Sequence, residues 1–325
     1  MKRTLLLVVG SVVGLIVGLV FAGASHADYP ERPVRIIVPF SPGGGSDLTS
    51  RLISQKLTES LGKQVVVENR PGGAGNIGTE AVARAPADGY TLLLATLSTA
   101  VNVSLFKKLP FDPLTSFEPV SLVVRVPLLL VVHPSVQATT VRELIDLARA
   151  KPGGLNYASG GTGTANHVGA ELFNAMADVK IALIGYKGGG PALSDLAGGH
   201  VQMMFGTMTA TRDIAKSGRL RAIATTSAAR SPSWPELPTI AESGVPGFEV
   251  SAWFGVMAPA GTPRTIVERL SIELARMARA PDVRTMLLDQ GNDPVGSTPE
   301  EFGRFLQFEI DKWSKLARSA KLQAD

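Results

Sequence analysis

Two glycine-rich segments of similar composition constrain the fold of this chain more than any other feature. The first runs from Pro39 to Asp47 and the second from Ser159 to Asn166, and each lies between a short apolar run and an amphipathic segment. This order predicts a strand, a loop and a helix N-terminus, twice. Because a helix N-terminus exposes unpaired N–H groups and carries about half a positive charge, both segments are candidate sites for a small anion.

Short β-rich runs alternate with helical patterns from Val34 onward, which is typical of parallel-sheet α/β proteins. Val34–Val38 is the first predicted strand, and Gly62 ends the helix that follows it. Further strands are predicted at or near 65–67, 91–95, 155–158, 181–185, 202–205 and 220–225, and further helices near 76–84, 140–151, 165–176, 262–280 and 298–313. Tyr186–Pro191 is expected to be a loop.

Two extended segments interrupt this alternation. Residues 119–132 are rich in branched side chains around a central proline, and residues 249–258 alternate as a strand. We interpret both as crossings between two lobes, with Trp253 and Phe254 in the core or at the hinge. Lobe 1 is predicted to comprise 28–124 and 253–325, and lobe 2 to comprise 125–252. Ligands of open α/β sheets lie at the carboxyl ends of the strands, which places a ligand cleft at the hinge.

The N-terminus has the layout of a secretory signal. Lys2 and Arg3 precede an apolar run from Leu5 to Phe21, and small residues lead to an expected cleavage after Ala27. The apolar run is nearly long enough to span a bilayer, so an uncleaved anchor is the alternative. Cleavage lowers the 32 Lys and Arg to 30, against 28 Asp and Glu. This balance gives no indication of nucleic-acid or acidic-membrane binding.

No metal centre or cofactor is expected. The chain has no cysteine, which excludes disulfides, thiolate ligands and a thiol nucleophile. The histidines beyond the signal, His133, His167 and His200, do not have the spacing of a metal pair. Gly73–Gly78 matches a dinucleotide fingerprint in letters only, because the next strand does not end in the acidic residue that holds a ribose.

The glycine-rich segments also indicate the kind of anion. Neither contains Lys or Arg, and the phosphate-binding P-loop signature is absent, so a carboxylate fits them better than a phosphate. Ser46 and Asp47 stand where a helix cap belongs; Asp47 is expected to cap its helix or to accept a hydrogen bond from a ligand. His167 follows the second segment and is a candidate ligand contact, with a local structural role as the alternative.

In combination, these segments resemble the Bug or TctC-like extracytoplasmic solute receptors of tripartite tricarboxylate transporters over essentially the whole chain after the signal. The phrases that carry the resemblance are Tyr29–Pro30, Pro33–Phe40, Pro42–Asp47, Glu68–Gly75, Ala87–Leu92, Leu109–Pro113, Tyr186–Ala192, Leu237–Glu242 and Ala258–Pro263. The resemblance implies an α/β, two-lobed periplasmic binding protein of type II-like architecture, with parallel-rich sheets flanked by helices. It further implies capture of a small carboxylate and its delivery to a membrane permease without enzymatic turnover. We expect a monomer.

In that family, the loop after the first strand and the loop that opens the ligand helix of the second lobe hold one carboxylate, partly through ordered water. These loops correspond to Phe40–Asp47 and Ser159–His167, with Thr96–Thr99 and Phe205–Thr209 as the remaining wall. The candidate ligand-binding residues are Phe40, Ser41, Gly44, Gly45, Ser46, Asp47, Thr96, Ser98, Ser159, Gly161, Thr162, Thr164, His167, Phe205, Gly206 and Thr207. Family members often carry an aspartate at the position of Gly206, so the glycine predicts a wider cleft and a ligand whose distal end is bulkier or uncharged.

Two other functions on the same fold stay open. An exported hydrolase would use Ser46 or Ser159 as its nucleophile, although no histidine is close to either serine in sequence and no G-x-S-x-G elbow is present. A sensory receptor would use the same closure of the lobes to dock on a signalling protein. The receptor without catalytic activity is the function that we expect.

Overall fold

One long strand organises the sheet. The computed structural model describes residues 29–320, so the predicted signal at 1–27 lies outside the described residues, and the chain from Arg32 onward packs as one unit. The strands are β1 (Val34–Val38), β2 (Val65–Asn69), β3 (Thr91–Thr96), β4 (Phe117–Val132), β5 (Asn156–Ser159), β6 (Ala182–Gly185), β7 (Met203–Thr207), β8 (Arg221–Thr225), β9 (Ser251–Pro259) and β10 (Asp293–Pro294). Within the described chain these ten strands join in the order β2-β1-β3-β9-β4-β7-β5-β6, and β8 and β10 also pair with β4.

The first part of the sheet is parallel, as the sequence predicted. β1 pairs in parallel with both β2 and β3, and its buried Val and Ile side chains follow the continuous apolar pattern of a strand covered on both faces. The helices of this part are α2 (Gly45–Leu61), α3 (Asn76–Ala83) and α4 (Leu97–Leu105), with a single 3₁₀ turn at Gly73–Gly75. Gly62 ends α2 in the left-handed conformation, as expected of a helix C-terminus.

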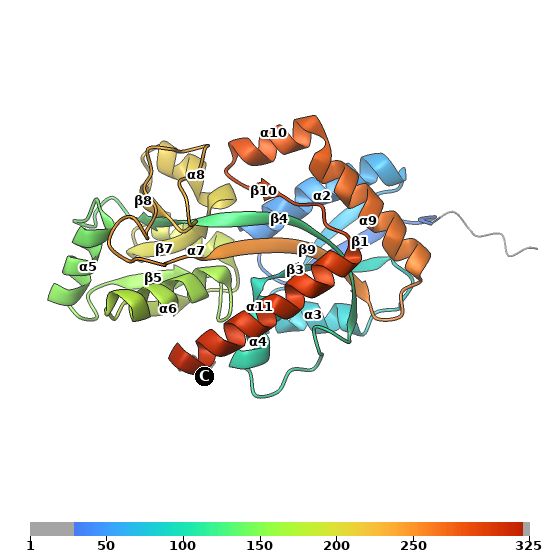
Figure 1. Cartoon of the computed structure of the whole chain (residues 1–325), viewed down its shortest axis with the longest axis horizontal. Coiled ribbons are helices and arrows are strands. Elements are labelled where there is room, and N and C mark those ends of the chain that lie inside the picture. Colours follow the sequence, from blue (N-terminus) through green and yellow to red (C-terminus); the bar gives the residue numbers. More distant parts are fainter. Residues whose placement is uncertain (1–28, 321–325) are drawn as a thin grey trace, which may run out of the picture. The chain divides into compact units, whose positions relative to one another are not determined.

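The two predicted crossings are the paired strands β4 and β9. They run antiparallel side by side from Phe117↔Pro259 to Pro127↔Ser251, and Figure 1 shows both connecting the elements of the two halves. The first part of β4 pairs with β9 and β10, whereas its last residues, Leu128–Val132, pair with β7 and β8. β9 is buried on both faces from Ala252 onward, because helices cover the sheet on each side.

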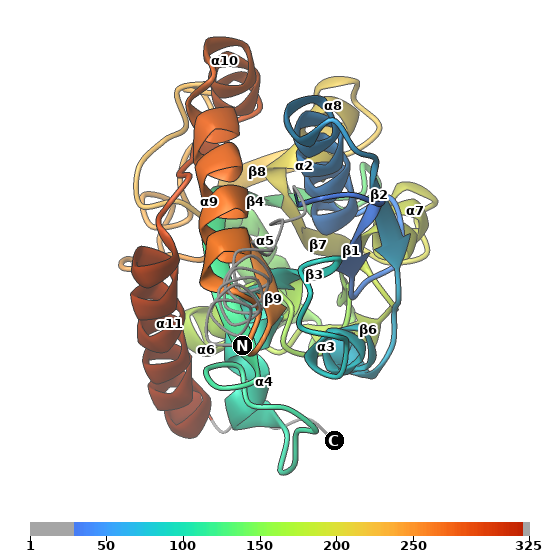
Figure 2. The same cartoon turned by 90° about the vertical axis from the view of Figure 1, so that its right-hand side faces the viewer.

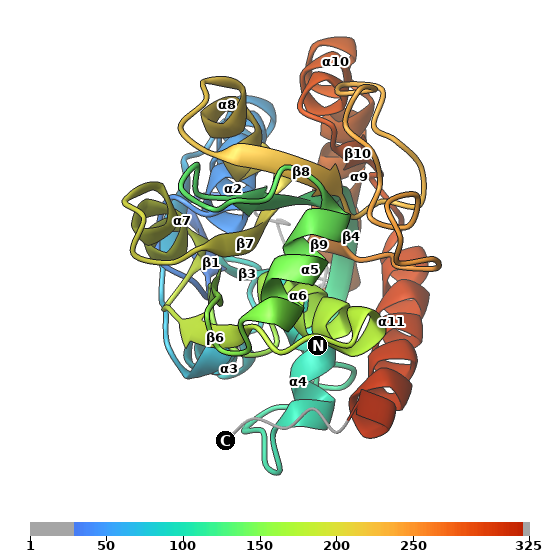
Figure 3. The ribbon, with the colours of Figure 1, turned by 90° about the vertical axis from the view of Figure 1, so that its left-hand side faces the viewer.

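The second part of the sheet repeats the parallel arrangement. β5 pairs in parallel with β6 and β7, and α6 and α7 both pack on β5 and β7 (Figure 3). Its helices are α5 (Val141–Ala150), α6 (Ala165–Ala177), α7 (Gly189–Ala197) and α8 (Met208–Lys216). At the start of α5 the hydroxyl of Thr140 accepts the N–H of Glu143, as its capping pattern predicted. The rings of Phe173, Phe205 and Phe248 pack together in the core of this part.

Four short helices were absent from the sequence-based prediction. α4, α7 and α8 each have 9 residues, as does α10 (Pro281–Asp289). The expectation of a loop over Tyr186–Pro191 was wrong at its end, because α7 begins at Gly189. Pro191 is compatible with this start, since the N–H groups of a first helical turn have no partner within the helix.

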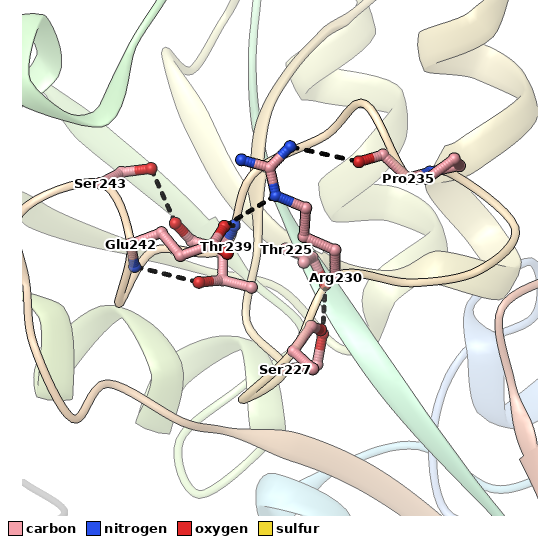
Figure 4. A network of polar contacts seen from close by, with 8 residues as sticks. Thr225, Ser227, Arg230, Pro235, Thr239, Glu242 and Ser243 are labelled. Carbon is pink, nitrogen blue, oxygen red and sulfur yellow. Dashed lines mark hydrogen bonds and ion pairs between the residues drawn. The ribbon is translucent and has the colours of Figure 1, made fainter.

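The segment between β8 and β9 is held by side-chain contacts rather than by regular structure. Arg230 forms an ion pair with Glu242 at 2.9 Å and donates to the carbonyl of Pro235, as Figure 4 shows. The backbone N–H of Thr239 donates to the carboxylate of Glu242, and the backbone N–H of Glu242 donates to the hydroxyl of Thr239. The carbonyl of Thr239 accepts the hydroxyl of Ser243. This network fixes the path by which the chain returns to β9.

The C-terminal helices pack on the first part of the chain, as predicted from their position after the return crossing. α9 (Arg264–Arg279) contacts α2 and β4, and α11 (Pro299–Ala320) lies against α4 and β4 (Figure 2). Trp253 of β9 stacks edge-to-face on Phe302 and Phe305 of α11. Its indole N–H donates to the buried carboxylate of Glu309, which also accepts the indole N–H of Trp313.

Candidate functional site

A pocket of about 50 Å³ lies where the two parts of the sheet meet, within about 560 Å³ of space between the surrounding atoms that includes open solvent. Its lining comes from both parts of the chain and from the crossing strand β9. The lining residues are Phe40, Gly44, Gly45, Ser46, Thr96, Leu97, Gly160, Thr164, Ala165, Asn166, Gly189, Leu193, Met204, Thr207, Ala210, Ala252, Trp253 and Phe254. Both glycine-rich segments therefore face the same space.

Five helices of the described chain begin at this pocket. The first residues of α2, α4, α6 and α7, and Thr207 immediately before α8, all line it. The first N–H groups of each helix have no acceptor within the helix, and the aligned peptide dipoles place a partial positive charge there. These helix N-termini therefore contribute positive partial charge at the pocket, although no Lys or Arg is among the residues that line it in the described structure.

The first glycine-rich segment is braced from behind by Asp47. One carboxylate oxygen accepts the backbone N–H of Gly43 at 3.1 Å and Arg51 Nε at 3.0 Å, and the other accepts the side-chain amide of Asn69 at 3.1 Å. Burial alone would raise the pKa of Asp47, but the bonds from Arg51, Gly43 and Asn69 outweigh it and hold this pKa below its ordinary value. Asp47 is therefore an ionised brace that fixes the loop, while Gly45 and Ser46 at the start of α2 line the pocket. The expected cap was wrong, because α2 begins after Gly44 and no side chain caps it.

Hydroxyl groups order the second glycine-rich segment. Thr164 caps α6 by accepting the N–H of His167, and its hydroxyl also donates to the carbonyl of Gly161 at 2.7 Å and lies 3.0 Å from Ser159 Oγ. His167 accepts the N–H of Gly163 through Nδ1. Burial lowers the pKa of His167 and outweighs the opposing effect of Glu171, which keeps the imidazole neutral near neutral pH.

The two halves touch directly beside the pocket. The N–H and the hydroxyl of Ser41 both donate to the carbonyl of Lys187, each at 3.0 Å. A Cβ on Gly190 would lie 2.0 Å from the carbonyl oxygen of Pro42, so glycine is required for this close approach of two backbones. The loop before α7 thus packs against the first glycine-rich segment.

Seven of the sixteen predicted ligand-binding residues line the pocket, namely Phe40, Gly44, Gly45, Ser46, Thr96, Thr164 and Thr207. Their contact with a ligand stays a prediction. Leu97, Gly160, Ala165 and Asn166 also line the pocket and lie within the predicted segments. The lining residues outside those segments are Gly189, Leu193, Met204, Ala210, Ala252, Trp253 and Phe254. Trp253 and Phe254 are buried on β9, as expected of core or hinge residues, and also form part of the wall.

The other nine predicted residues lie outside the lining, namely Ser41, Asp47, Ser98, Ser159, Gly161, Thr162, His167, Phe205 and Gly206. Ser41, Asp47, Ser159 and His167 make the structural contacts described above, and Ser98 Oγ lies 2.8 Å from Thr96 Oγ1. Phe205 is fully buried in its aromatic cluster. The wider cleft expected from Gly206 was wrong, because the direction of its missing side chain is filled by Thr211.

A comparison with protein-family models identifies the family. The model described as "Tripartite tricarboxylate transporter family receptor" matches residues 49–322, which is most of the chain. The chain belongs to this receptor family.

Individual relatives match over nearly their full length. BugT of Bordetella pertussis is 40% identical over 319 residues, covering 96% of this chain and 98% of BugT. The structure of R. palustris Rpa4515 with adipate superposes with a TM-score of 0.88 at 39% identity, covering 90% of this chain and 98% of that one. The periplasmic binding protein BugD gives a TM-score of 0.88 at 35% identity, covering 91% and 100%. The fold is therefore the two-lobed α/β fold of periplasmic binding proteins, as predicted.

The described residues lack both a membrane-spanning helix and a metal site. No helix among them has the length and apolar character needed to cross a bilayer. No group of three or more His, Cys, Asp or Glu side chains in the described residues is placed to hold a metal ion.

Proposed function

We propose that this receptor binds one small organic carboxylate in the pocket and delivers it to the membrane permease of a tripartite tricarboxylate-type transporter. The observation that carries the proposal is the meeting of five helix N-termini at a pocket whose described lining holds no charged side chain. Such a pocket attracts an anion while its N–H groups and hydroxyls replace the hydration of a carboxylate. The related Rpa4515 was solved with adipate, which supports a carboxylate as the ligand.

The proposed lobes are 28–124 with 253–325, and 125–252. Both boundaries fall on the paired crossings at neighbouring positions, since Val124 pairs with Phe254 and Arg125 with Trp253. Bending of β4 and β9 at this level would move the halves as bodies and open the contact between Ser41 and Lys187. Closure around a ligand then creates the surface that the permease recognises.

The proposal places the protein in the periplasm as a monomer, exported by the signal at 1–27 and cleaved after Ala27. It also assigns no enzymatic turnover. Ser159, one of the two serines that a hydrolase would use, supports this, because its Oγ bonds with Thr164 and Gly161, and the nearby His167 accepts the N–H of Gly163 through Nδ1. A sensory role would use the same closure of the lobes. Uptake of the labelled ligand in cells that lack the permease separates the two roles: transport predicts that uptake is lost, and a sensory role predicts that it is unchanged.

A thermal-shift screen of purified protein tests the proposal. Carboxylic acids are compared with their neutral primary amides; an acid at 100 times its Kd adds about 2.7 kcal/mol to the free energy of unfolding, and the amide adds none. Thr207→Val removes a hydroxyl of the pocket with little change in shape and should reduce the shift, whereas Thr115→Val on an exposed turn should not. A shift by another class of solute without any by acids, or chemical conversion of the ligand, contradicts the proposal.

A further inference from the structure

A second contact between the proposed lobes is made by Asn102 of α4 and by the turn at Gly73–Gly75. A Cβ on Gly163 would lie 2.1 Å from Asn102 Oδ1. A Cβ on Gly161 would lie 3.9 Å from Cα of Ala74. Asn102 and Ala74 belong to the proposed lobe 1, whereas the two glycines belong to lobe 2. The second glycine-rich segment therefore packs on lobe 1 through residues other than those of the contact beside the pocket.

Asn102 is held in place from its own lobe. Its side-chain nitrogen donates to the carbonyl of Ala74 at 3.1 Å and to Asn76 Oδ1 at 2.8 Å, so its oxygen is the atom that faces Gly163. Among the buried side-chain nitrogen and oxygen atoms of the described residues, this oxygen is the one without a hydrogen-bond partner. Buried polar groups of folded proteins are nearly always paired, so an unpaired oxygen at a contact between lobes calls for a functional explanation.

The turn that Asn102 holds has a strained backbone. Ala74 has a φ of 57° and a ψ of 31°, the left-handed region that a residue with a Cβ seldom adopts. Strained residues persist where surrounding contacts hold them, and they concentrate at ligand clamps and switch regions. The turn also lies within Gly73–Gly78, the match to a dinucleotide fingerprint that the proposed function does not use.

We infer that Asn102 is a positioning residue for ligand capture: its oxygen meets the backbone of Gly163 when the lobes close and returns to water when they open. The contact sets the position of the second glycine-rich segment, because Gly163 directly precedes Thr164, which caps α6 and lines the pocket. Closure without a bound acid is disfavoured here, since the oxygen then gives up bonds to water without gaining a donor. The inference rests on the proposed function and adds a residue that determines how the pocket closes.

Disulfide trapping in the full mature chain tests the inference. The chain has no cysteine, so Ala74→Cys with Gly161→Cys introduces a single pair, and the two positions are close enough for a disulfide. The rate of crosslinking follows the population of the closed form. It should rise about tenfold or more when adipate, or whichever acid gives the largest thermal shift in the screen, is present at saturation.

A matched pair within one lobe provides the control. Ser104 Oγ of α4 and Ser314 Oγ of α11 lie 2.6 Å apart, and both residues belong to the proposed lobe 1. Ser104→Cys with Ser314→Cys should therefore crosslink at the same rate with and without the acid. If the pair at 74 and 161 also crosslinks at one rate while the acid still binds, the inference is overturned and the proposed function stands. If no acid in the screen binds, both are overturned.

A rescue experiment tests the role of Asn102 itself. Gly163→Ala places a methyl group on Asn102 Oδ1 and should raise the Kd for the acid about tenfold or more. Asn102→Ala removes the overlapping atoms, so adding Gly163→Ala to Asn102→Ala should raise the Kd less than about threefold. Gly163 has a φ of 76°, and strain of alanine in that conformation does not depend on residue 102. Equal losses in both backgrounds would therefore overturn the inference, and melting curves establish that each variant is folded.

Discussion

At the scale of single residues, the pocket depends on glycines, which have no side chain, as much as on the residues that have one. A Cβ on Gly45 would lie 2.3 Å from Thr207 Oγ1, so the N-terminus of α2 approaches the start of α8 only because position 45 is glycine. The glycine-rich composition of both segments was visible in the sequence. The partners that these glycines approach were not visible. Those of the first segment lie more than 100 residues away along the chain, and in the second segment Gly160 and Gly163 approach Gly188 and Asn102.

Gly45→Ala should therefore weaken ligand binding. The added methyl group overlaps Thr207, and relieving such overpacking costs about 1–3 kcal/mol, or roughly a tenfold to hundredfold increase in Kd. Titration calorimetry with the best carboxylate measures the change. Gly185→Ala is the matched control, because a Cβ there meets no atom within 4 Å. Unchanged affinity of Gly45→Ala would show that this close approach is not needed for binding.

His167 should make stability depend on pH. Burial lowers its pKa below the ordinary value of 6.5, so the unfolded chain takes up a proton at a pH where the folded chain does not. Stability should thus be constant above about pH 6.5 and fall as the pH decreases from there towards the folded-state pKa. Melting temperatures of the wild type and His167→Gln between pH 8 and 5 measure this contribution. An equally steep fall in the variant would assign the effect to other groups.

At the scale of elements, strand, loop and helix units were predictable because β1 with α2 and β5 with α6 carry strong hydrophobic periodicity. The short helices α4, α7 and α8 were missed, since nine residues give little periodicity and α7 opens with two glycines. These three helices supply the N-termini that turn two expected anion-binding ends into five. The sequence therefore predicted the chemistry of the pocket better than its extent.

The brace behind α2 makes a specific prediction. Asp47→Asn retains the shape of the side chain but removes the negative charge of the carboxylate. That carboxylate accepts hydrogen bonds from the N–H of Gly43 and from the side chains of Arg51 and Asn69. Hydrogen bonds to a charged group contribute about 1.5–3 kcal/mol, so the free energy of unfolding should fall by about 1–3 kcal/mol and ligand affinity should fall with it. Urea denaturation with and without ligand checks both. Asp146→Asn, on the exposed side of α5, should change neither; equal behaviour of the two variants would contradict the brace.

The contact between α11 and β9 gives another prediction. Glu309→Leu leaves the buried indole N–H groups of Trp253 and Trp313 without their acceptor. An unsatisfied buried donor costs about 1–3 kcal/mol, and the loss for two should be about 2–4 kcal/mol in urea denaturation. Glu309→Gln keeps an acceptor oxygen and should lose less than half of that. Comparable losses in both variants would mean that the carboxylate acts through its charge rather than as an acceptor.

At the scale of the whole molecule, the crossings β4 and β9 were recognisable from sequence because branched residues and Pro127 are incompatible with a helix. Their antiparallel pairing brings the predicted boundaries after Val124 and Ala252 onto neighbouring pairs of one ladder. Sequence patterns do not predict which residues of β4 and β9 pair, since pairing between segments about 120 residues apart depends on the whole sheet. The shared ladder gives the proposed lobes a single level at which to bend.

The central claim is that backbone N–H groups of helix N-termini from both halves hold one carboxylate. A crystal structure of the mature protein with its tightest-binding acid tests this claim most directly. We predict carboxylate oxygens within 2.7–3.2 Å, the ordinary hydrogen-bond range, of N–H groups at the starts of α2 and α6, directly or through one water. A carboxylate that lies away from both helix starts, or is paired with a Lys or Arg side chain, would contradict the account.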